Sequence, residues 1–561
     1  MVLFGGLLAL VTWLAAAIVL IAAGSAFIRR NFPKHPLNTA QLITAVWWGL
    51  GIMTLLGYLL AFFIPLRSTI SGLTVLAVTV ILGAIGWRGA MRVGFTPPRW
   101  SKSTVALAAA LALVAGYLAL AVLGPVTHYD AGLYQWAAVQ YAGDYAVIPG
   151  LANLYGPLGY ASAEPVLGAL LGATPWQTEG FRLLGGVFVL LLGLEALART
   201  LSRPRDAGTA IALVGTALVF PPMIWMADFW VVSPTPDLPV LVLAIVAAAY
   251  LADLVTGKHT PNALPTIVVL AALMTALRPT AAALAGTLVI TAALVAWRRR
   301  TGGRGLIVAA AVLTAALAVT VFARDRMLSG WLPYPLSVNA FDVPWRAPDP
   351  EGLRTATLGF ARDPENWQEA SSGWEWVGPW FARLPQQWEP WWLLAALIAA
   401  VALLVTAGTV STRPRALLAV MAPYLLATAT WWLLGPPALR FGWGPLFGIT
   451  AILLGWGLWR RRLQIPVTYA LAVGIAAITL VAAVIRLDWT SPRETQSWLG
   501  IPYSVIPLPT ASTSEFVTDS GLILRMPTDT DQCWAVYPMC TPDPMPSLEF
   551  IGEGITSGFV S

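Results

Sequence analysis

Fourteen apolar stretches, most of them close to 20 residues long, recur along nearly the whole chain. A helix needs about 20 apolar residues to cross roughly 30 Å of hydrocarbon. The stretches are continuous and rich in Ala, Leu and Val, whereas strands of a membrane β-barrel are about ten residues long and alternate in polarity. The sequence therefore predicts an all-α polytopic membrane protein with about 14 transmembrane helices. The stretches lie near 2–27, 42–64, 69–87, 104–124, 181–199, 207–226, 238–256, 262–277, 280–297, 305–323, 391–410, 416–434, 444–459 and 464–485.

Composition excludes a soluble globular protein. Of the 561 residues, 58% are hydrophobic and only 11% are charged, which leaves too little polar surface to face water on all sides. The net charge of +6 comes from the loops between the apolar stretches. It therefore indicates topology and contact with anionic lipids, and it does not indicate nucleic-acid binding.

Charge also predicts the orientation of the chain. The short loops after the odd-numbered stretches hold 20 of the 33 Lys and Arg residues, while 24 of the 27 acidic residues lie on the other side. Because Lys and Arg accumulate in cytoplasmic loops, we expect these short loops in the cytoplasm. The three long polar segments, 125–180, 324–390 and 486–561, are then extracytoplasmic.

This topology divides the chain into six regions, whose boundaries are known to a few residues. The segment 262–297 is ambiguous, because Arg278 and Pro279 interrupt a single apolar stretch. Two spans joined by a tight turn preserve the charge pattern, and a re-entrant pair of half-helices is the alternative. The regions are 1–124 (N-terminal transmembrane helices), 125–180 (first extracytoplasmic loop with an interfacial helix), 181–323 (central transmembrane helices), 324–390 (Trp-rich extracytoplasmic loop), 391–485 (C-terminal transmembrane helices) and 486–561 (extracytoplasmic tail).

Both cysteines, Cys533 and Cys540, lie in the predicted extracytoplasmic tail. An oxidising compartment favours a disulfide between them. Two free thiols or a metal pair are the alternatives, although the tail contains no histidine. Aromatic residues mixed with Pro and Gly predict that the tail is a small ordered cap of irregular or β structure.

The segment from Thr127 to Trp136 is the first candidate for chemistry. In it, Asp130 follows a helix that leaves the membrane and begins an aromatic amphipathic stretch. A carboxylate in this place faces a substrate at the interface and can accept its proton. His128 and Tyr134 are further candidates for contact with a substrate or a metal. The alternative is that Asp130 is a helix cap or a solvated loop acid.

Three more charged residues lie at the outer ends of predicted helices. Asp237 ends a Pro-rich turn and opens a span, where the alternative is that it is a helix N-cap acid stabilised by the helix dipole. Arg278 and Arg440 lie in outer turns, where an arginine either snorkels or offers its planar donor fork to a lipid phosphate. Because the ends of neighbouring helices can surround one cavity, these residues and Asp130 predict a site for a phosphate leaving group and a nucleophile to be deprotonated.

Tryptophans and metal ligands give weaker signals. The Trp residues in and beside the second long loop, 324–390, favour an interfacial belt, with stacking platforms for sugar rings as the alternative. His128 is the only histidine on the predicted outer face, which excludes a histidine-rich metal site. A divalent cation, Mg²⁺ or Mn²⁺, held by Asp130 and Asp237 with a lipid phosphate is left open. The Trp residues are Trp331, Trp345, Trp367, Trp374, Trp376, Trp380, Trp388, Trp391 and Trp392.

Six short motifs follow one another from about residue 125 to the C-terminus. With the many spans, the acid that begins the first long outer loop and the C-terminal cap, they resemble the GT-C superfamily of glycosyltransferases, which use polyprenyl-phosphate sugars as donors. The detailed strings are most similar to a bacterial family of largely uncharacterised multi-pass membrane proteins. The motifs are Asp130 to Tyr134, Pro149 to Gly159, Ser233 to Asp237, Ser329 to Pro335, Pro437 to Phe441, and Cys533 to Cys540.

The resemblance implies an inverting glycosyltransferase in a bacterial cytoplasmic (inner) membrane. Asp130 would be the general base, Arg278 and Arg440 would hold the departing polyprenyl phosphate, and Asp237 would orient the sugar or a metal. The expected partners are a polyprenyl-phosphate-linked sugar, a glycan, lipid or protein acceptor, and membrane lipids, but no nucleic acid.

One observation argues against part of this interpretation, and one other class of protein competes with it. Asp130 has no second acid beside it, unlike many GT-C enzymes, which argues against a two-carboxylate metal site within that loop. The competing class is a transporter or flippase of a lipid-linked or cell-envelope substrate. Such a protein would carry ionisable residues deep within its membrane spans.

Overall fold

A computed structural model describes residues 1–31, 38–90, 94–257, 262–300, 303–406, 414–498 and 500–561. The chain is mostly helical, and thirteen helices of this described part are long and apolar enough to cross a membrane. The predicted cytoplasmic loops around 32–37, 91–93, 258–261, 301–302 and 407–413 lie wholly or partly outside the described residues. The prediction of a multi-pass, mainly α-helical membrane protein is confirmed.

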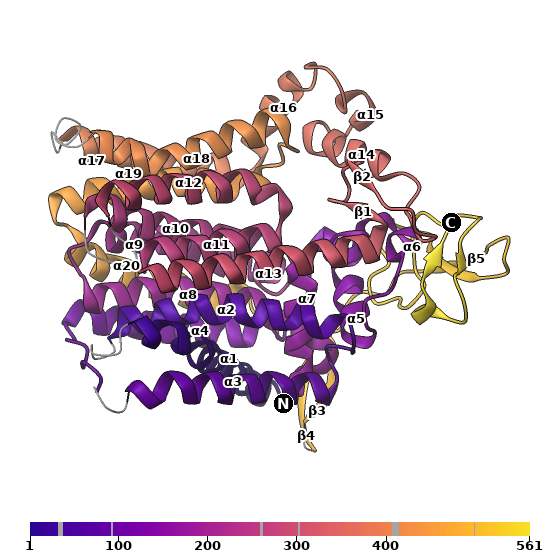
Figure 1. The fold of residues 1–561 in the computed structure, drawn as a ribbon, viewed down its shortest axis with the longest axis horizontal. Helices are drawn as coiled ribbons and strands as arrows, with labels where there is room; N and C mark the ends of the chain where they lie inside the picture. Colours follow the sequence, from indigo (N-terminus) through magenta and orange to yellow (C-terminus); the bar gives the residue numbers. More distant parts are fainter. Residues whose placement is uncertain (32–37, 91–93, 258–261, 301–302, 407–413, 499) are drawn as a thin grey trace.

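The long helices run side by side across the molecule (Figure 1). Their bounds agree with the predicted apolar stretches to within a few residues. They are α1 (Val2–Asn31), α2 (Thr39–Ala61), α3 (Thr69–Ala90), α4 (Lys102–Ala121), α8 (Leu184–Ser202), α9 (Ala207–Trp225), α10 (Asp237–Thr256), α12 (Ala282–Arg299), α13 (Arg304–Ser329), α17 (Trp388–Thr406), α18 (Pro414–Leu434), α19 (Trp443–Arg461) and α20 (Gln464–Ile485).

The eighth predicted span, 262–277, is shorter than a full membrane crossing. Helix α11 (Ala263–Leu277) has 15 residues, which gives a length of about 22 Å, less than the thickness of the hydrocarbon core. It ends at Arg278, whose backbone is extended because Pro279 disfavours a helical conformation before it. The turn η6 (Pro279–Ala281) then leads into α12, which packs beside α11. The segment 262–297 is therefore a helical hairpin, and the described count is thirteen long helices and one short one.

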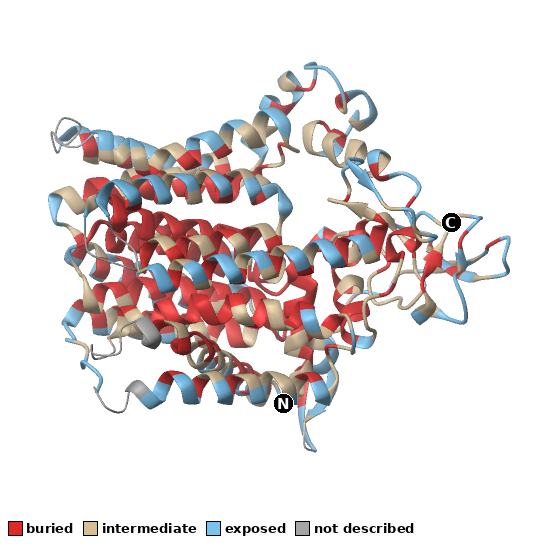
Figure 2. Cartoon of the chain, in the orientation of Figure 1, coloured by how far each residue is buried: buried red, intermediate tan, exposed pale blue. Residues whose placement is uncertain are grey.

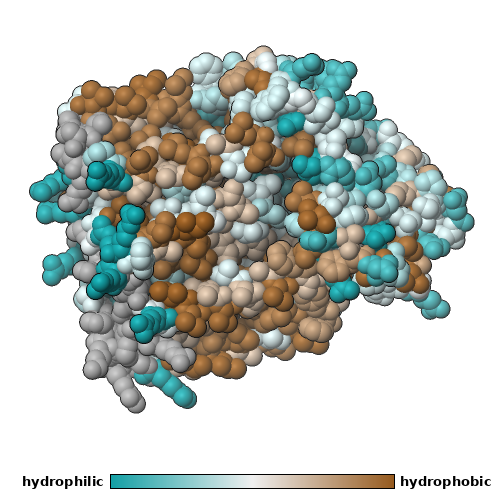
Figure 3. Space-filling view, turned by 45° about the horizontal axis from the view of Figure 1, so that its top comes forward, coloured by the Kyte–Doolittle hydropathy of each residue, from teal (hydrophilic) through white to brown (hydrophobic). Residues whose placement is uncertain are grey.

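Helix α10 lies at the centre of the bundle. Its apolar window is completely buried, and Figure 2 shows the buried residues concentrated around it and α11. A helix that is apolar on all sides is stable only when other helices cover it. Helices α3, α17, α18 and α20 lie at the periphery and expose most of their apolar side chains. Figure 3 shows this apolar surface as a broad region bounded by polar ends.

Short elements gather at one end of the bundle, which we call the tail end because residues 486–561 pack there (Figure 1). Helix α13 begins at the opposite end and reaches the tail end beside α6. The short elements are the π-helical turn η1 (Ala131–Gln135), α5 (Trp136–Asp144), α6 (Leu151–Leu154), η2 (Gly156–Gly159), α7 (Ala163–Leu171), η3 (Gly172–Trp176), η4 (Gln177–Leu183), α14 (Pro350–Arg362), α15 (Trp367–Ala370), α16 (Val377–Arg383), η7 (Leu384–Gln386), η9 (Leu439–Gly442) and η10 (Ile555–Ser557).

The strands of the described residues form four separate antiparallel pairs, three of them in the tail. Each pair is a short hairpin or clasp, so none builds an extended sheet. The pairs, each with one residue match, are β1 (Trp331–Leu332) with β2 (Asn339–Ala340), Trp331 opposite Ala340; β3 (Glu494–Trp498) with β4 (Ile501–Val505), Glu494 opposite Val505; β5 (Thr513–Val517) with β6 (Ile523–Pro527), Thr513 opposite Pro527; and β7 (Glu549–Phe550) with β8 (Phe559–Val560), Glu549 opposite Val560.

The tail is fixed to the bundle by buried hydrogen bonds. The Ile506 N–H donates to the Leu123 carbonyl at 2.8 Å, just after α4. The completely buried Arg182 donates to the carbonyls of Gly124 at 2.6 Å and Ile506 at 2.9 Å. Two guanidinium hydrogen bonds to buried carbonyls hold the tail and the end of α4 together.

The predicted disulfide between Cys533 and Cys540 is present. We expect intact protein to yield no alkylated cysteine without reductant and two after reduction. Replacing both cysteines with Ser should lower the stability of the tail by about 2–3 kcal/mol, because the unfolded tail regains the freedom of the closed loop. Mass spectrometry after alkylation, and limited proteolysis of the tail, check both effects. Two alkylated cysteines in unreduced protein would contradict the bridge.

Candidate functional site

Four charged residues that are far apart in the sequence meet at the tail end. Arg440 Nη2 lies 2.8 Å from Asp130 Oδ2, and Arg278 forms an ion pair with Asp237. The two pairs are adjacent, because Arg440 Nε is 4.0 Å from Asp237 Oδ2. We call Asp130, Asp237, Arg278 and Arg440 the charged cluster. The structure thus brings together the acids and arginines that the sequence placed at separate helix ends.

Local structure explains how each acid is held. Asp237 is the first residue of α10, where the positive end of the helix dipole favours a carboxylate. Its Oδ2 also accepts a hydrogen bond from the Thr235 hydroxyl at 3.1 Å. Asp130 immediately precedes η1 and makes no side-chain capping bond there. The N-cap position belongs to Pro236, so Asp237 is a first-turn acid and not the predicted N-cap, and it also pairs with Arg278. The carboxylate of Asp130 is engaged by Arg440.

An aromatic ring underlies both arginines. The guanidinium carbon of Arg278 is 4.0 Å from the centre of the Phe441 ring, and that of Arg440 is 5.1 Å from it. A guanidinium over a ring face is attracted by the negative face of the ring and stays planar and accessible at its edge. Two like charges are therefore held close together by Phe441 and by the two carboxylates.

His128 is buried beside this cluster, and its ring packs against those of Phe229 and Trp230. Burial lowers its pKa to about 3; the charge of Asp130 opposes this shift, and those of Arg440 and Arg278 reinforce it. The imidazole is therefore neutral near pH 7 and carries one N–H.

Each ring nitrogen of His128 faces a hydrogen-bond donor. The Asp130 backbone N–H lies 3.2 Å from Nδ1, and Arg440 Nη1 lies 3.2 Å from Nε2. A neutral imidazole can accept at one nitrogen only, so one of these contacts brings two donors together. If Nδ1 accepts from Asp130, the Nε2–H and the Arg440 N–H both need an acceptor. An oxygen of a bound ligand beside Arg440 would satisfy them.

Tyr134, the remaining predicted site residue, lies on η1 one turn after Asp130. Its ring contacts that of Tyr160 with 5.9 Å between centres. Burial raises the pKa of the Tyr134 hydroxyl, and the negative charge of Asp130 raises it further. The hydroxyl therefore stays protonated and can donate a hydrogen bond close to the cluster.

The side chains of the cluster do not suit a divalent cation. Within the described part of the chain, no three His, Cys, Asp or Glu residues are placed to hold a metal. Asp130 and Asp237 are each engaged by an arginine, and Arg440 is near both. A cation would have to displace a guanidinium from each carboxylate, which is a poor donor set for Mg²⁺ or Mn²⁺.

The tail covers the segment that carries Asp130, a contact that was not predicted from the sequence. The backbone N–H of Trp534 donates to the Gly132 carbonyl at 3.0 Å. A Cβ at position 132 would overlap the indole ring of Trp534. Gln532 donates to the Tyr129 carbonyl at 2.7 Å, and the Tyr129 hydroxyl donates to Asp531. Residues 531–534, where the disulfide loop begins, therefore hold residues 129–132 on both sides of Asp130. Gly132 was the available sequence signal, since a glycine permits this close approach.

Part of the Trp-rich region packs against the turn that carries Arg440. Trp380 donates from Nε1 to the Pro437 carbonyl at 2.8 Å. A Cβ at Gly442 would overlap the ring of Trp431, so the indole packs directly on η9. Trp376 and Trp380 are buried in this contact, whereas Trp374 and Trp391 are exposed. Two of the predicted tryptophans thus support the Arg440 turn, two exposed ones are suited to an interfacial belt, and the other five are half-buried.

Comparison with known proteins gives a family and no function. No curated protein and no solved structure matches the chain. A family model described as "Domain of unknown function (DUF8201)" matches residues 7–447. This range includes the whole charged cluster and excludes the tail. Because the match covers well over half of the sequence, the chain belongs to this family of domains of unknown function.

Proposed function

We propose that the protein is a membrane glycosyltransferase of the GT-C type that moves a hexose or pentose from a polyprenyl-phosphate donor to a glycan, lipid or protein acceptor. The tail end would face the extracytoplasmic side of a bacterial cytoplasmic membrane, as the charge distribution of the loops predicts. The observation that carries the proposal is the charged cluster at that end, where a carboxylate shares an arginine with a second acid and a second arginine is adjacent.

The geometry supports a single displacement. Asp130 would accept the proton of the acceptor hydroxyl while the acceptor oxygen forms a bond to the anomeric carbon. The bond from that carbon to the phosphate oxygen would break at the same time, which inverts the configuration. The phosphate would leave with the bonding electron pair, and Arg278 and Arg440 would stabilise its growing negative charge.

The hydrogen-bond donors around His128 support binding of the donor's phosphate in this position. A phosphate oxygen beside Arg440 Nη1 and His128 Nε2 would accept from both and remove the contact between two donors. Recruiting Arg440 to the phosphate would also weaken its ion pair with Asp130 and free that carboxylate to take a proton. Binding of the polyprenyl-phosphate sugar would thereby free Asp130 to act as the base.

The binding step can be tested with geranylgeranyl phosphate, which has a polyprenyl chain and a phosphate but no sugar. We expect native mass spectrometry of detergent-solubilised protein to show a complex with this probe and little with geranylgeraniol. Arg278→Ala or Arg440→Ala should weaken binding by roughly 30- to 700-fold, which corresponds to about 2–4 kcal/mol for a desolvated charge contact. Arg440→Lys should bind with intermediate affinity because it keeps the charge and loses the fork.

Arg486→Ala is the matched control for this test. Arg486 lies at the same end of the bundle and is paired with Asp228 at 3.1 Å, but it is not part of the charged cluster. Its loss should leave binding of the probe unchanged. If wild-type protein does not bind geranylgeranyl phosphate, or if the Arg278 and Arg440 variants bind it like the wild type, the transferase proposal fails in favour of a transporter.

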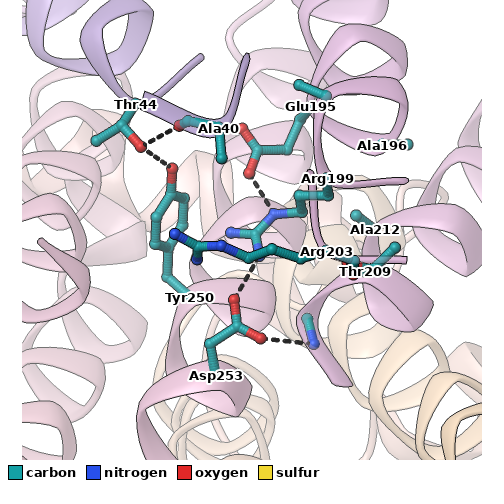
Figure 4. A network of polar contacts seen from close by, with 12 residues as sticks. Ala40, Thr44, Glu195, Ala196, Arg199, Arg203, Thr209, Ala212, Tyr250 and Asp253 are labelled. Atoms are coloured by element: carbon teal, nitrogen blue, oxygen red, sulfur yellow. Dashed lines mark hydrogen bonds and ion pairs between the residues drawn. The ribbon is translucent and has the colours of Figure 1, made fainter. Parts of the chain in front are cut away.

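One observation bears on the transporter alternative. Glu195, Arg199 and Asp253 form a buried network near the opposite end of α8 and α10 (Figure 4). Arg199 is paired with both acids; Asp253 also accepts the Gly208 N–H at 2.9 Å, and Glu195 accepts Trp47 Nε1–H at 2.8 Å. A transported ion needs ligands that can be released. These groups satisfy one another, so the network favours a structural role.

A further inference from the structure

A second buried arginine, remote from the charged cluster, lies at the tail end of α13. Arg324 is only 5% exposed, and its Nε has no hydrogen-bond partner. The single protein hydrogen bond of its guanidinium runs from Nη1 to the Ser162 carbonyl at 3.3 Å. The neighbouring Asp325 accepts the Tyr334 N–H at 2.8 Å instead. Among the described residues, no carboxylate forms an ion pair with Arg324; the charge of Asp325 acts on it at longer range, and the centre of the Tyr58 ring lies 6.0 Å from its guanidinium carbon.

An unpaired buried guanidinium is uncommon because removing a charge from water is costly unless a counter-charge replaces the lost solvation. The other buried arginines of the described helices show the usual solution. Arg199 has two carboxylates, and Arg182 has one carboxylate and two carbonyls. Arg324 has a single long hydrogen bond to a neutral carbonyl. The fold therefore leaves most of its five N–H groups unused.

Arg324 lines a cavity that is otherwise almost wholly apolar. The cavity is small and open at the surface. It lies between α5, α6 and the ends of α2 and α13. Its walls include Tyr141, Ile148, Leu151, Leu158 and Leu328.

We propose that this cavity binds an amphiphile that has an apolar chain and an anionic head group, with the head group paired to Arg324. The apolar walls around the opening match the part of the chain next to the head group, and the one cation in the lining matches a carboxylate or a phosphate. Its place at the end of a membrane-length helix gives access to ligands dissolved in a lipid layer. The site is distinct from the charged cluster and does not depend on the proposed glycosyl transfer.

The link between this cavity and the charged cluster runs through one residue. Ser162 accepts from Arg324 at its carbonyl and donates from its hydroxyl to the Leu277 carbonyl at 2.7 Å. Leu277 immediately precedes Arg278. A head group that replaces Ser162 as the hydrogen-bond partner of Arg324 would therefore change a contact next to Arg278, a member of the charged cluster.

Four probes distinguish the possible sources of the ligand. Sodium oleate offers a carboxylate and a chain, dioleoyl phosphatidate offers a phosphate and chains, oleyl alcohol offers a chain alone, and inorganic phosphate offers an anion alone. We expect oleate or the phosphatidate to bind in native mass spectrometry and to raise the unfolding temperature in a non-ionic detergent, since a ligand of the folded state stabilises it. Oleyl alcohol and inorganic phosphate should have little effect.

Arg324→Gln should weaken binding of the effective probe by about 10- to 100-fold, the usual contribution of hydrogen bonds to a charged group. The matched control is Arg326→Gln on the same helix, where the exposed arginine stacks on Phe341. It should bind the probe like the wild type. Ala146→Leu keeps Arg324 but fills part of the cavity, and it should also weaken binding. Arg324→Lys should retain part of the affinity and serves if the Gln variant does not fold.

The possible results separate clearly. The proposal is overturned if no anionic amphiphile binds, if Arg324→Gln and Arg324→Lys both bind like the wild type, or if Arg326→Gln loses as much affinity as Arg324→Gln. Equal binding of oleyl alcohol would show that the cation has no role, and equal binding of inorganic phosphate would show that the apolar walls have none. Preference for oleate or for phosphatidate identifies the head group and supports the proposal in either case.

Discussion

Replacing Asp130 with Asn is expected to lower glycosyl transfer by about 10²- to 10⁴-fold, the usual contribution of a positioned general base. The amide is nearly isosteric with the carboxylate but cannot take the acceptor proton. Transfer is measured with synthetic polyprenyl-phosphate hexoses and pentoses in membranes that contain the protein. Binding of geranylgeranyl phosphate should be unchanged or tighter, because the neutral amide of the variant would no longer compete with the phosphate for Arg440.

Asp144→Asn is the control for this variant. Asp144 ends the same segment, at the C-terminus of α5, and is also paired with an arginine, Arg67, at 3.3 Å. Its replacement should leave transfer almost unaffected. Transfer at the wild-type rate by Asp130→Asn would remove Asp130 from the role of base. Loss of both transfer and probe binding would instead indicate a structural role.

Replacing Arg199 with Met is expected to give the largest loss of stability in the chain. It would leave Glu195 and Asp253 as two completely buried carboxylates without a cation. Removing one partner of a buried ion pair typically costs about 3–5 kcal/mol. Unfolding in detergent, followed by tryptophan fluorescence, measures the loss.

Two further variants test the cause of this loss. Arg203→Gln removes a half-buried arginine four residues further on and should have a small effect. Adding Glu195→Gln and Asp253→Asn to Arg199→Met removes the unpaired charges and should restore much of the stability. If the triple variant is no more stable than Arg199→Met, the loss arises from packing and not from buried charge.

Much of the fold followed from the sequence, because the hydrocarbon core of a membrane demands long apolar helices. The prediction located every long helix, since continuous apolar stretches have no alternative structure in lipid. It also gave the bounds of α11 to within one residue, although hydropathy alone does not show whether so short a helix crosses the membrane. Pro279 marked the break correctly.

The site was predicted only in part, because its contacts join residues that are far apart in the sequence. Asp130, Asp237, Arg278 and Arg440 were individually recognisable as charges at helix ends. Their pairing depends on how the helices pack, which a single sequence does not specify. The contacts of Phe441 with both arginines and of Trp534 with Gly132 left no periodic pattern to detect. Arg324 was counted as one more residue of an outer loop, and its burial depends on α13 continuing to Ser329.

The contact between Trp534 and Gly132 has a consequence for biogenesis. Ribosomes make the chain from its N-terminus, so Asp130 enters the membrane system about 400 residues before Asp531 and Gln532 are synthesised. During that interval the helices can insert and pack, but the covering over residues 129–132 does not yet exist. The site can therefore be completed only after residues 531–534 have been synthesised and have reached the tail end. A chain truncated before residue 531 would carry the charged cluster without this cover.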